Sequence, residues 1–313
     1  MTNTTTKRTA LDRQMDRIRD MEESGRLSTK LTNRAIRKLT ANKLAVLGIF
    51  MFVAICVLCF GAPLFTKYSP SEFSLLDRME GPTLEHICGT DQMGRDIWTR
   101  MLYGGRISIV VGLGSALGAA LIGVTLGLFV GYKGGIVDSL LMKIADIFLS
   151  FPQMVLIIIV VALVGKSLQN LIIIFVLTGW PSMYRMARSK VLSLKEEEFV
   201  QALRAFGISD VKIAFKHLLP NTLGPVVVNI TLSTAMFILQ EASLSVIGYG
   251  VPQEVATWGN IINVITNSGT IRFDWLGYWW MWLPCSIMLI LFVLAINFIG
   301  DGLRDASDPN QIG

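Results

Sequence analysis

Charged residues are scarce in this chain. Only 16% of its 313 residues are Asp, Glu, Lys or Arg, whereas 52% are hydrophobic. A soluble domain carries roughly a quarter charged residues, so the composition excludes an ordinary soluble protein and indicates a membrane protein. The net charge of +5 would also suit a nucleic-acid partner, but its distribution along the chain favours a role in membrane orientation.

Histidine and cysteine are also few. The two histidines, His86 and His217, lie far apart in the sequence and form no ligand cluster. The cysteines lie in or near apolar runs, and the one C-x-x-C pair falls inside an apolar run, where a redox or zinc role is not expected. No G-x-x-x-x-G-K-S/T phosphate loop occurs, which excludes a nucleotide site of that kind. We therefore expect no metal site, and we interpret the cysteines as small apolar side chains: Cys56, Cys59, Cys88 and Cys285.

Six uncharged stretches are each long enough to cross a bilayer, for which about 20 apolar residues suffice. Backbone groups in lipid must be satisfied internally, and these runs are typical of helices rather than barrel strands. The third run continues a helical stripe from near Asp138, and Pro152 should kink it. The sequence thus predicts an all-α membrane protein with six transmembrane helices: Leu44–Phe65, Ile107–Tyr132, Ile147–Gly165, Ser167–Tyr184, His217–Gln240 and Trp275–Gly300.

The loop charges predict the orientation. With the N-terminus inside, the cytoplasmic segments hold 20 Lys and Arg residues and the outer segments hold 6. Cytoplasmic loops carry the excess of basic residues, so both termini and the 185–220 loop are expected to be cytoplasmic and the 66–105 loop extracellular. Residues 1–43 are expected to form an amphipathic cytoplasmic segment near anionic lipid, 44–303 the transmembrane domain and 304–313 a cytoplasmic tail.

The second predicted span is rich in glycine. Gly114 and Gly118 form one G-x-x-x-G pair, and Gly123 and Gly127 form another. Small residues at this spacing let two helix backbones approach closely. The pattern predicts tight helix packing and leaves open whether the partner helix belongs to this chain or to another.

A polar island, Lys195–Asn221, interrupts the apolar runs. Gly207 should end a first short helix in the left-handed conformation, Ser209 could cap a second, and Pro220 should end or kink that second helix. Two interpretations stay open, a docking surface and an ordinary solvated loop. The predicted apolar faces are Phe199, Ala202, Leu203 and Phe206 on the first helix, and Val211, Ala214, Phe215 and Leu218 on the second.

The same island carries a recognisable motif. Gln201-Ala202-Leu203-x3-Gly207-x11-Leu219-Pro220 resembles the cytoplasmic EAA loop of ABC-type importer permeases, E-A-A-x3-G-x9-I-x-L-P. The match holds at Ala202, Gly207, Leu219 and Pro220. It departs at Gln201, Leu203 and His217, where the pattern has Glu, Ala and Ile, so a contact that needs a carboxylate is not transferred.

Four further segments extend the resemblance to about residues 38–309. Their features are GTDQMGRD at 89–96, D-x-x-L-M-K-x-x-D with L-S-F-P at 138–152, E-A-x-L-S with W-G-N at 241–260, and GDGLRDA at 300–306. These segments are similar to permeases of the oligopeptide, dipeptide and nickel importer family, and the first and last resemble its second permease subunit. The first 37 residues carry no such match.

The resemblance implies a type I ABC importer permease fold in the cell membrane. It implies a sister permease, two ATPase subunits that bind ATP and Mg²⁺, and an extracellular or periplasmic binding protein, so this chain would be no enzyme and would bind no cofactor. The coupling loop would follow closure of the ATPases as a rigid body and drive alternating access. Its residues are Phe199, Gln201, Ala202, Leu203, Phe206, Gly207, Phe215, Leu219 and Pro220.

Several polar residues suggest further sites. Glu241 interrupts the fifth span, where an ionisable group is a functional hypothesis by default; a structural hydrogen bond and a substrate contact at an outer gate are equally open. Ser245 and Asn229 are grouped with it as candidates for the translocation pathway. Asp138 and Asp146 are expected to face a cytoplasmic interface. A salt-bridged outer turn, rather than a peptide clamp, is expected from Asp91, Arg95, Asp96 and Arg100. An interfacial aromatic belt is expected from Trp275, Trp279, Trp280 and Trp282.

The leading hypothesis is therefore a peptide importer permease. Permeases for nickel, metallophores or other small solutes share these motifs and form the alternative. An ATP-independent channel or secondary transporter would be expected to carry several buried charges or broken helices, and Glu241 is the one clear candidate in the sequence. A DNA-binding helix pair is excluded because the pair is tethered between two membrane spans.

Overall fold

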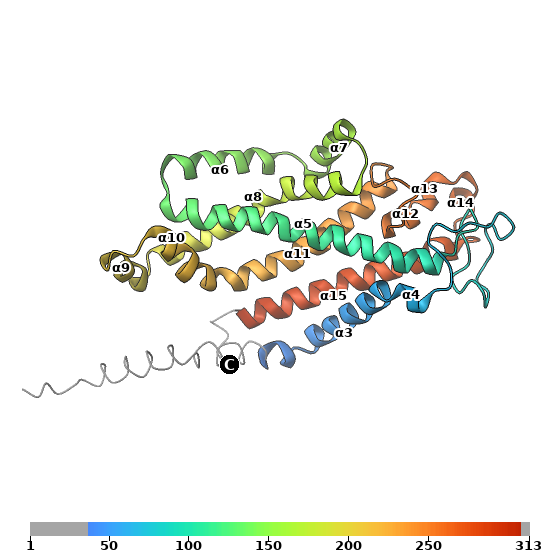
Figure 1. Cartoon of the computed structure of the whole chain (residues 1–313), viewed down its shortest axis with the longest axis horizontal. Helices are drawn as coiled ribbons and strands as arrows, with labels where there is room; N and C mark the ends of the chain where they lie inside the picture. Colours follow the sequence, from blue (N-terminus) through green and yellow to red (C-terminus); the bar gives the residue numbers. More distant parts are fainter. Residues whose placement is uncertain (1–36, 308–313) are drawn as a thin grey trace, which may run out of the picture.

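The computed structural model describes residues 37–307, which form an elongated bundle of helices (Figure 1). Most of the predicted amphipathic segment 1–43 and the end of the 304–313 tail lie outside the described residues. The elements are α3 (Lys43–Phe60), α4 (Ala62–Phe65), α5 (Ile97–Lys133), α6 (Gly135–Ser150), α7 (Gln153–Val164), α8 (Leu168–Lys195), α9 (Glu198–Ala205), α10 (Asp210–Lys212), a π-helical segment (Ile213–Leu218), α11 (Leu219–Val246), α12 (Trp258–Ile262), α13 (Val264–Asn267), α14 (Gly269–Phe273), a 3₁₀ turn (Trp279–Met281) and α15 (Leu283–Ser307).

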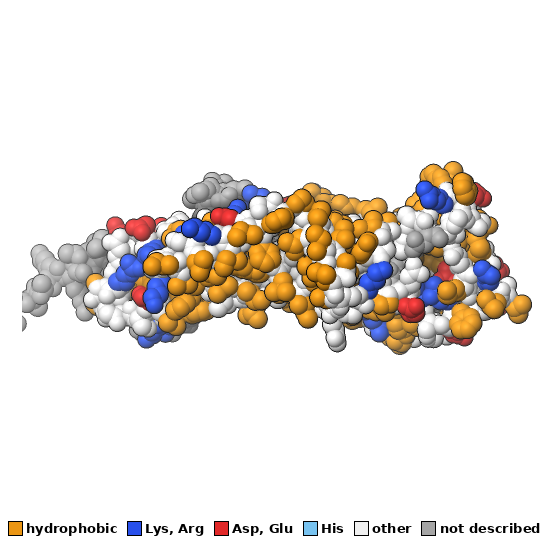
Figure 2. Space-filling view, turned by 90° about the horizontal axis from the view of Figure 1, so that it is seen from above, with side chains coloured by type: hydrophobic (Ala, Val, Ile, Leu, Met, Phe, Trp, Pro, Cys, Tyr) orange, Lys and Arg blue, Asp and Glu red, His pale blue; other side chains and the backbone are white. Residues whose placement is uncertain are grey.

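Within residues 37–307, four helices are long and apolar enough to cross a membrane, or five if α6 and α7 count as one broken span. The four are α3, α5, α15 and the continuous helical stretch Asp210–Val246. The predicted fourth span lies within α8, a 28-residue helix that is too polar to pass on composition. Apolar side chains cover the middle of the face in Figure 2, and charged side chains gather toward its two ends.

Two predicted span boundaries were wrong at the outer end. The second span starts ten residues before the predicted Ile107, at Ile97, because the Asp96 carboxylate caps α5 by accepting the Thr99 amide at 2.7 Å. The last span starts at Leu283 rather than Trp275. The tryptophan-rich segment before it forms a loop and a 3₁₀ turn, which pack into one lobe with residues 66–96. We call it the outer lobe, after the orientation that the sequence predicts.

The predicted kink at Pro152 is a complete break. The axes of α6 and α7 differ by 91°, and Phe151 between them is extended, with φ −88° and ψ 143°. The residue before a proline is pushed toward extended conformations, because the proline ring clashes with it in the helical region. One predicted span is therefore two helices at right angles.

Three of the four glycines in the two G-x-x-x-G pairs pack against α8 of the same chain, which answers the question left open by the sequence. A Cβ on Gly123 would lie 2.6 Å from the Trp180 carbonyl oxygen, and one on Gly127 would lie 2.7 Å from the Ala187 Cβ. In contrast, a Cβ on Gly114 would meet nothing within 4 Å in the described chain. A Cβ on Gly118 would lie 2.6 Å from Val176 Cγ2 of α8, so close approach of α5 and α8 depends on Gly118, Gly123 and Gly127.

Pro220 neither ends nor sharply kinks its helix, which corrects the sequence prediction. The helix runs on from Asp210 to Val246, and the turn before the proline is π-helical, with the Leu219 amide bonded to the Ala214 carbonyl. The Asn221 side-chain amide donates to the His217 carbonyl at 2.7 Å. The wider turn accommodates the missing proline N–H within a continuous helix.

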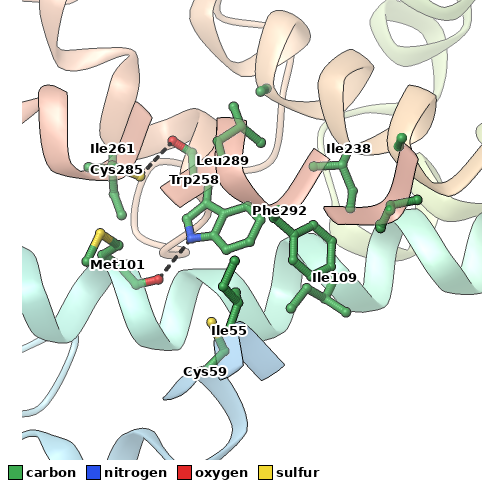
Figure 3. Packing of buried hydrophobic residues seen from close by; sticks show 13 residues of the cluster. Ile55, Cys59, Met101, Ile109, Ile238, Trp258, Ile261, Cys285, Leu289 and Phe292 are labelled. Carbon is green, nitrogen blue, oxygen red and sulfur yellow. Dashed lines mark hydrogen bonds between the residues drawn. The ribbon is translucent and has the colours of Figure 1, made fainter. Parts of the chain in front are cut away.

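A compact apolar core holds the outer ends of α3, α5, α11 and α15 together (Figure 3). At its centre is Trp258 of α12, which is fully buried and donates its indole N–H to the Met101 carbonyl at 3.0 Å. The Phe292 ring packs against it with centroids 5.3 Å apart, and the Cys285 thiol lies 3.6 Å from the Trp258 carbonyl oxygen. The short helix α12 therefore fixes the spacing of the long helices.

Candidate functional site

The polar island forms α9, α10 and the π-helical segment, which lie together at the end of the molecule opposite the outer lobe (Figure 1). Gly207 has φ +72°, the left-handed conformation that the sequence predicted. The Ile208 amide bonds the Leu203 carbonyl at 3.1 Å and the Gly207 amide bonds the Arg204 carbonyl at 2.9 Å. This pair of bonds is a Schellman motif, which ends α9 and turns the chain toward α10.

The outward face of these helices is apolar. Phe206 is 83% exposed, Val211 52%, Phe199 42% and Phe215 38%, and Ala202 and Gln201 are exposed beside them. Solvent-exposed apolar clusters of this kind mark interaction sites. We call Phe199, Ala202, Phe206, Val211 and Phe215 the docking surface, after the role that the sequence predicts for this island.

The inward face differs in part from the predicted one. Leu203, expected beside Phe199, is half-buried and packs instead with the fully buried Val200, Ile213 and Leu218. These side chains join the apolar cluster between α5 and α8. Leu219 also packs there, whereas Pro220 is exposed. The docking surface is thus attached to the bundle through its opposite side.

A cationic stack reinforces this attachment. Tyr132, at the end of α5, is buried, and its hydroxyl accepts a hydrogen bond from Arg204 Nε of α9 at 2.7 Å. The Arg204 guanidinium lies 4.9 Å from the centre of the Tyr132 ring and Lys195 Nζ lies 5.7 Å from it. Both are distances at which cations are attracted to an aromatic ring. Tyr132 therefore ties α9 to the glycine-rich helix α5.

Asp138 is buried and hydrogen-bonded within this chain rather than facing a cytoplasmic interface, which corrects the prediction. Its carboxylate accepts two bonds from Arg188 at 2.6 Å each and one from the Tyr184 hydroxyl at 2.8 Å. Bidentate arginine–carboxylate pairs are among the stronger and more directional side-chain bonds. Asp146 remains half-exposed and pairs with Arg185. These bonds fasten α6 to α8 beside the docking end.

A groove of about 360 Å³ lies where α6 and α7 part from each other. We call this cavity the groove. The Gln240 amide of α11 donates to the Gln153 Oε1 of α7 at 3.0 Å, and the Gln153 amide lies 3.4 Å from the Thr178 hydroxyl of α8. Ser182 and Ser233 add hydroxyl groups to the lining. The apolar walls include Phe148, Phe151, Leu156, Met236 and Phe237.

Glu241 lies outside the groove, in a buried hydrogen-bond node. It is fully buried, and its carboxyl oxygens accept bonds from Ser245 at 2.9 Å and Ser108 at 3.2 Å. Ser108 also accepts the Trp258 amide at 3.2 Å. Of the two open interpretations, this geometry supports the structural bond. Asn229 is half-buried and donates to the Pro225 carbonyl at 3.0 Å on its own helix.

The outer turn is salt-bridged, as the sequence predicted. Arg95 Nε lies 2.7 Å from Asp91, and Arg100 lies 3.8 Å from the same carboxylate. Asp96 pairs with His86 at 3.0 Å while it caps α5. These charges fix the start of α5.

Known proteins match this chain over nearly its whole length. Residues 123–312 match the family described as "Binding-protein-dependent transport system inner membrane component". This chain belongs to that family of permeases. Residues 30–82 of the permease also match the "N-terminal TM domain of oligopeptide transport permease C".

Curated relatives are similar to this permease over most of its length and most of their own. The dipeptide transport system permease protein DppC of Alkalihalophilus pseudofirmus is 42% identical, covering 88% of this permease and 89% of the relative. The oligopeptide transport system permease protein OppC of Bacillus subtilis is 36% identical, covering 93% of each chain. An inward-facing structure of the methionine ABC transporter MetNI, 22% identical, covers 67% of this permease and 96% of its own chain with a TM-score of 0.52. That likeness shows the fold, that of an ABC importer permease in the membrane.

Sequence reasoning missed two side-chain contacts of the permease. Tyr132 and Arg204 are 72 residues apart, and Gln153 and Gln240 are 87 apart. The available signal for the second pair was a glutamine inside or beside an apolar run, where a polar side chain is costly unless bonded. No comparable local signal marked the first pair.

Proposed function

We propose that the permease is one of two transmembrane subunits of an ATP-driven importer that carries oligopeptides or dipeptides across the cell membrane. The observation that carries this proposal is the near-full-length similarity to dipeptide and oligopeptide permeases. That similarity also favours peptides over nickel or metallophore cargo. Family membership favours an ATP-driven importer over an ATP-independent channel or secondary transporter, although the broken span α6–α7 is a feature such transporters also have.

The same proposal assigns six spans and two cytoplasmic termini. Besides the four apolar helices, α6–α7 would form a broken span and α8 would form the sixth, since it runs against α5 through the glycine contacts. The start of α3 and the end of α15 lie side by side, with the Asn42 amide 3.2 Å from the Asp305 carboxylate. The excess of basic residues at that end supports a cytoplasmic position.

In this arrangement the permease catalyses no reaction and binds no cofactor. Two ATPase subunits would bind ATP and Mg²⁺, and a separate extracellular or periplasmic binding protein would deliver the cargo. One ATPase would cover the docking surface. Its closure would move α9 and α10, and Tyr132 and the cluster around Val200 would pass that movement to α5.

Reconstitution into liposomes tests the function directly. We expect the complete assembly, with its sister permease, ATPases and binding protein, to accumulate a labelled dipeptide or oligopeptide only when ATP is present. This permease reconstituted by itself should show no uptake. Uptake by this chain in the absence of any ATPase would refute the proposal.

A substitution at Gly207 tests the coupling role. Gly207→Val places a β-branched residue at a φ of +72°, where such side chains are strongly disfavoured. We expect peptide uptake to fall by at least about tenfold while membrane insertion stays normal, since roughly 1–2 kcal/mol of strain must be relieved by moving the turn. Gly207→Asn is the matched control, because asparagine tolerates this conformation. Unchanged uptake by Gly207→Val would remove the coupling role from this loop.

A further inference from the structure

We propose that the groove is a binding site for the peptide backbone of the cargo, in which the side-chain amides of Gln240 and Gln153 exchange hydrogen bonds with the cargo's own amide groups. This inference rests on the proposed peptide-transport function. It adds the residues of this chain that would contact the cargo and the chemistry by which they would accept many different peptides.

The chemistry of the groove lining is the first argument. Its polar side chains are two amides and three hydroxyls, and all of its twelve lining residues are uncharged. A primary amide carries both donors and an acceptor, and each ordinary peptide unit carries one donor and one acceptor. The lining therefore matches the feature that all peptides share and is indifferent to the charge of their side chains.

The bonding state of the glutamine pair is the second argument. Gln240 Oε1 is enclosed, and it has no hydrogen-bond donor in the part of the chain that the structure describes. A buried polar atom left in this state costs more than an ordinary hydrogen bond gains. The Gln153 amide is only weakly held, at 3.4 Å from the Thr178 hydroxyl. When the weakly held Gln153 amide moves aside, a cargo N–H would supply the donor that Gln240 lacks.

The broken backbone is a third, independent argument. Phe151 and Pro152 are not helical, although the polypeptide here lies between two apolar helices. Irregular backbone at membrane depth is tolerated where it is buried in protein or lines a water-filled cavity. Phe151 is 56% exposed in this chain and lines the groove. A water-filled groove is one of the two settings that this rule allows, and the inference assigns the break to it.

The apolar walls suit cargo of varied shape. Met236 lines the groove beside Phe237, and both come from the same helix as Gln240. Methionine adapts to irregular surfaces because it is unbranched and polarizable. Amides would hold the cargo backbone, while these walls would accommodate its side chains.

The test compares two cargoes in the complete importer. One is trialanine, and the other is trialanine with both peptide nitrogens methylated, which removes the backbone donors. We expect Gln240→Leu to reduce the importer's preference for the unmodified peptide by about 3- to 10-fold, the loss of one neutral hydrogen bond. The binding protein is identical in all assemblies, so its own preference cancels in the ratio.

Ser243→Ala is the matched control. Ser243 lies on the same helix one turn from Gln240 but is exposed outside the groove, and this variant should keep the wild-type preference. The same preference in Gln240→Leu and wild type would overturn the inference while leaving peptide transport intact. Failure of the wild-type importer to carry either peptide would overturn the proposed function, and the inference with it.

Thiol labelling gives a second readout that does not depend on the cargo. Ser233→Cys places a thiol in the groove and Ser243→Cys places one outside it. A charged, membrane-impermeant reagent should modify the first at least about fivefold faster in the assembled importer, read site by site by mass spectrometry. Burial raises the pKa of the native Cys88 thiol to about 11, so Cys88 contributes little labelling at neutral pH. Equal rates at the two introduced thiols would show that the groove is not on an aqueous route.

Discussion

Glu241 shows how a single residue in a span can be structural. Its carboxyl group joins α11 to α5 through Ser108, and Ser108 in turn accepts the amide of Trp258. Three elements that are distant in sequence therefore meet at one buried side chain. Removing it would leave several polar groups without partners in the interior.

Replacement of Glu241 should lower the stability of the protein. For Glu241→Leu we expect a loss of about 1–3 kcal/mol in the free energy of unfolding, because the buried O–H groups of Ser108 and Ser245 would lose their acceptor. Thermal unfolding of the purified complex measures it. Glu241→Gln keeps an acceptor of the same shape and should lose clearly less. Equal stability of the leucine variant and the wild type would contradict the structural role.

Single residues could be placed from the sequence where the local backbone favours one residue type. Gly207 was placed correctly because a left-handed helix end favours glycine. Leu203 was placed wrongly because Phe199, Leu203 and Phe206 share one helical stripe, and the sequence does not say which part of that stripe faces α5 and α8. Asp138 was wrongly assigned to an interface because its partners, Arg188 and Tyr184, lie on another helix. The sequence alone does not show that this helix packs against α6.

At the scale of elements, the contact between α5 and α8 is set by backbone proximity. Gly123 and Gly127 bring α5 within reach of backbone and Cβ atoms of α8, and a side chain there has no space. The helices can pack this closely because small residues keep their axes near. The two helices therefore behave as one unit.

Alanine substitutions in α5 should separate packed glycines from open ones. We expect Gly123→Ala to cost about 1–3 kcal/mol through overpacking, since its Cβ would lie 2.6 Å from the Trp180 carbonyl oxygen. Gly114→Ala meets no atom of the described chain and should be neutral, or stabilising by up to about 1 kcal/mol through helix propensity. Thermal unfolding and yield of the purified chain compare them. Similar losses in both variants would contradict this packing scheme.

The Tyr132 stack should control how firmly α9 is held. Tyr132→Leu removes both the hydroxyl acceptor and the ring that Arg204 and Lys195 face, interactions that together contribute about 1–3 kcal/mol. We expect amide hydrogen exchange in α9 to quicken by at least about fivefold, measured by mass spectrometry. Tyr132→Phe keeps the ring and should give an intermediate rate. Unchanged exchange in both variants would show that the apolar cluster alone holds the loop.

Helices were predictable where a long run of the sequence was uniformly apolar. The apolar runs located α3 and most of α5, α11 and α15, because uniform hydrophobicity over a bilayer's thickness has few other causes. The break at Pro152 was expected only as a kink, since its size depends on the space left by α8 and α11. The groove was not predicted, because Gln153 and Gln240 meet only once that break has formed.

For the whole molecule, the two ends have different surfaces. At the docking end, exposed aromatic and aliphatic side chains are held on helices that are anchored from beneath. At the other end, exposed apolar side chains such as Leu84 lie on the non-helical outer lobe. The exposed apolar side chains are thus held on helices at the first end and largely on loops at the second.

Assembly should therefore be sensitive to charge at the docking end. Phe206, 83% exposed, would be buried by an ATPase, and Phe206→Asp should weaken recovery of the ATPase with the permease by at least about tenfold, because an unpaired carboxylate in an apolar interface is costly. Co-purification at several salt concentrations measures it. Leu84→Asp is the matched control at the opposite end and should leave recovery unchanged. Equal recovery with both variants would place the ATPase elsewhere.

The π-helical segment before Pro220 has a consequence for how this family of chains can vary in length. A π-turn holds one residue more than an α-helical turn, and each residue turns a helix by about 100°. The wide turn absorbs that extra residue, so deleting one residue within Ile213–Leu218 would return the segment to an α-helix and leave α9 and α10 close to their present direction. The same deletion in an ordinary α-helical turn of α11 would rotate α9 and α10 by about 100°, so a single-codon deletion in the π-helical segment is the one expected to leave the docking surface in place.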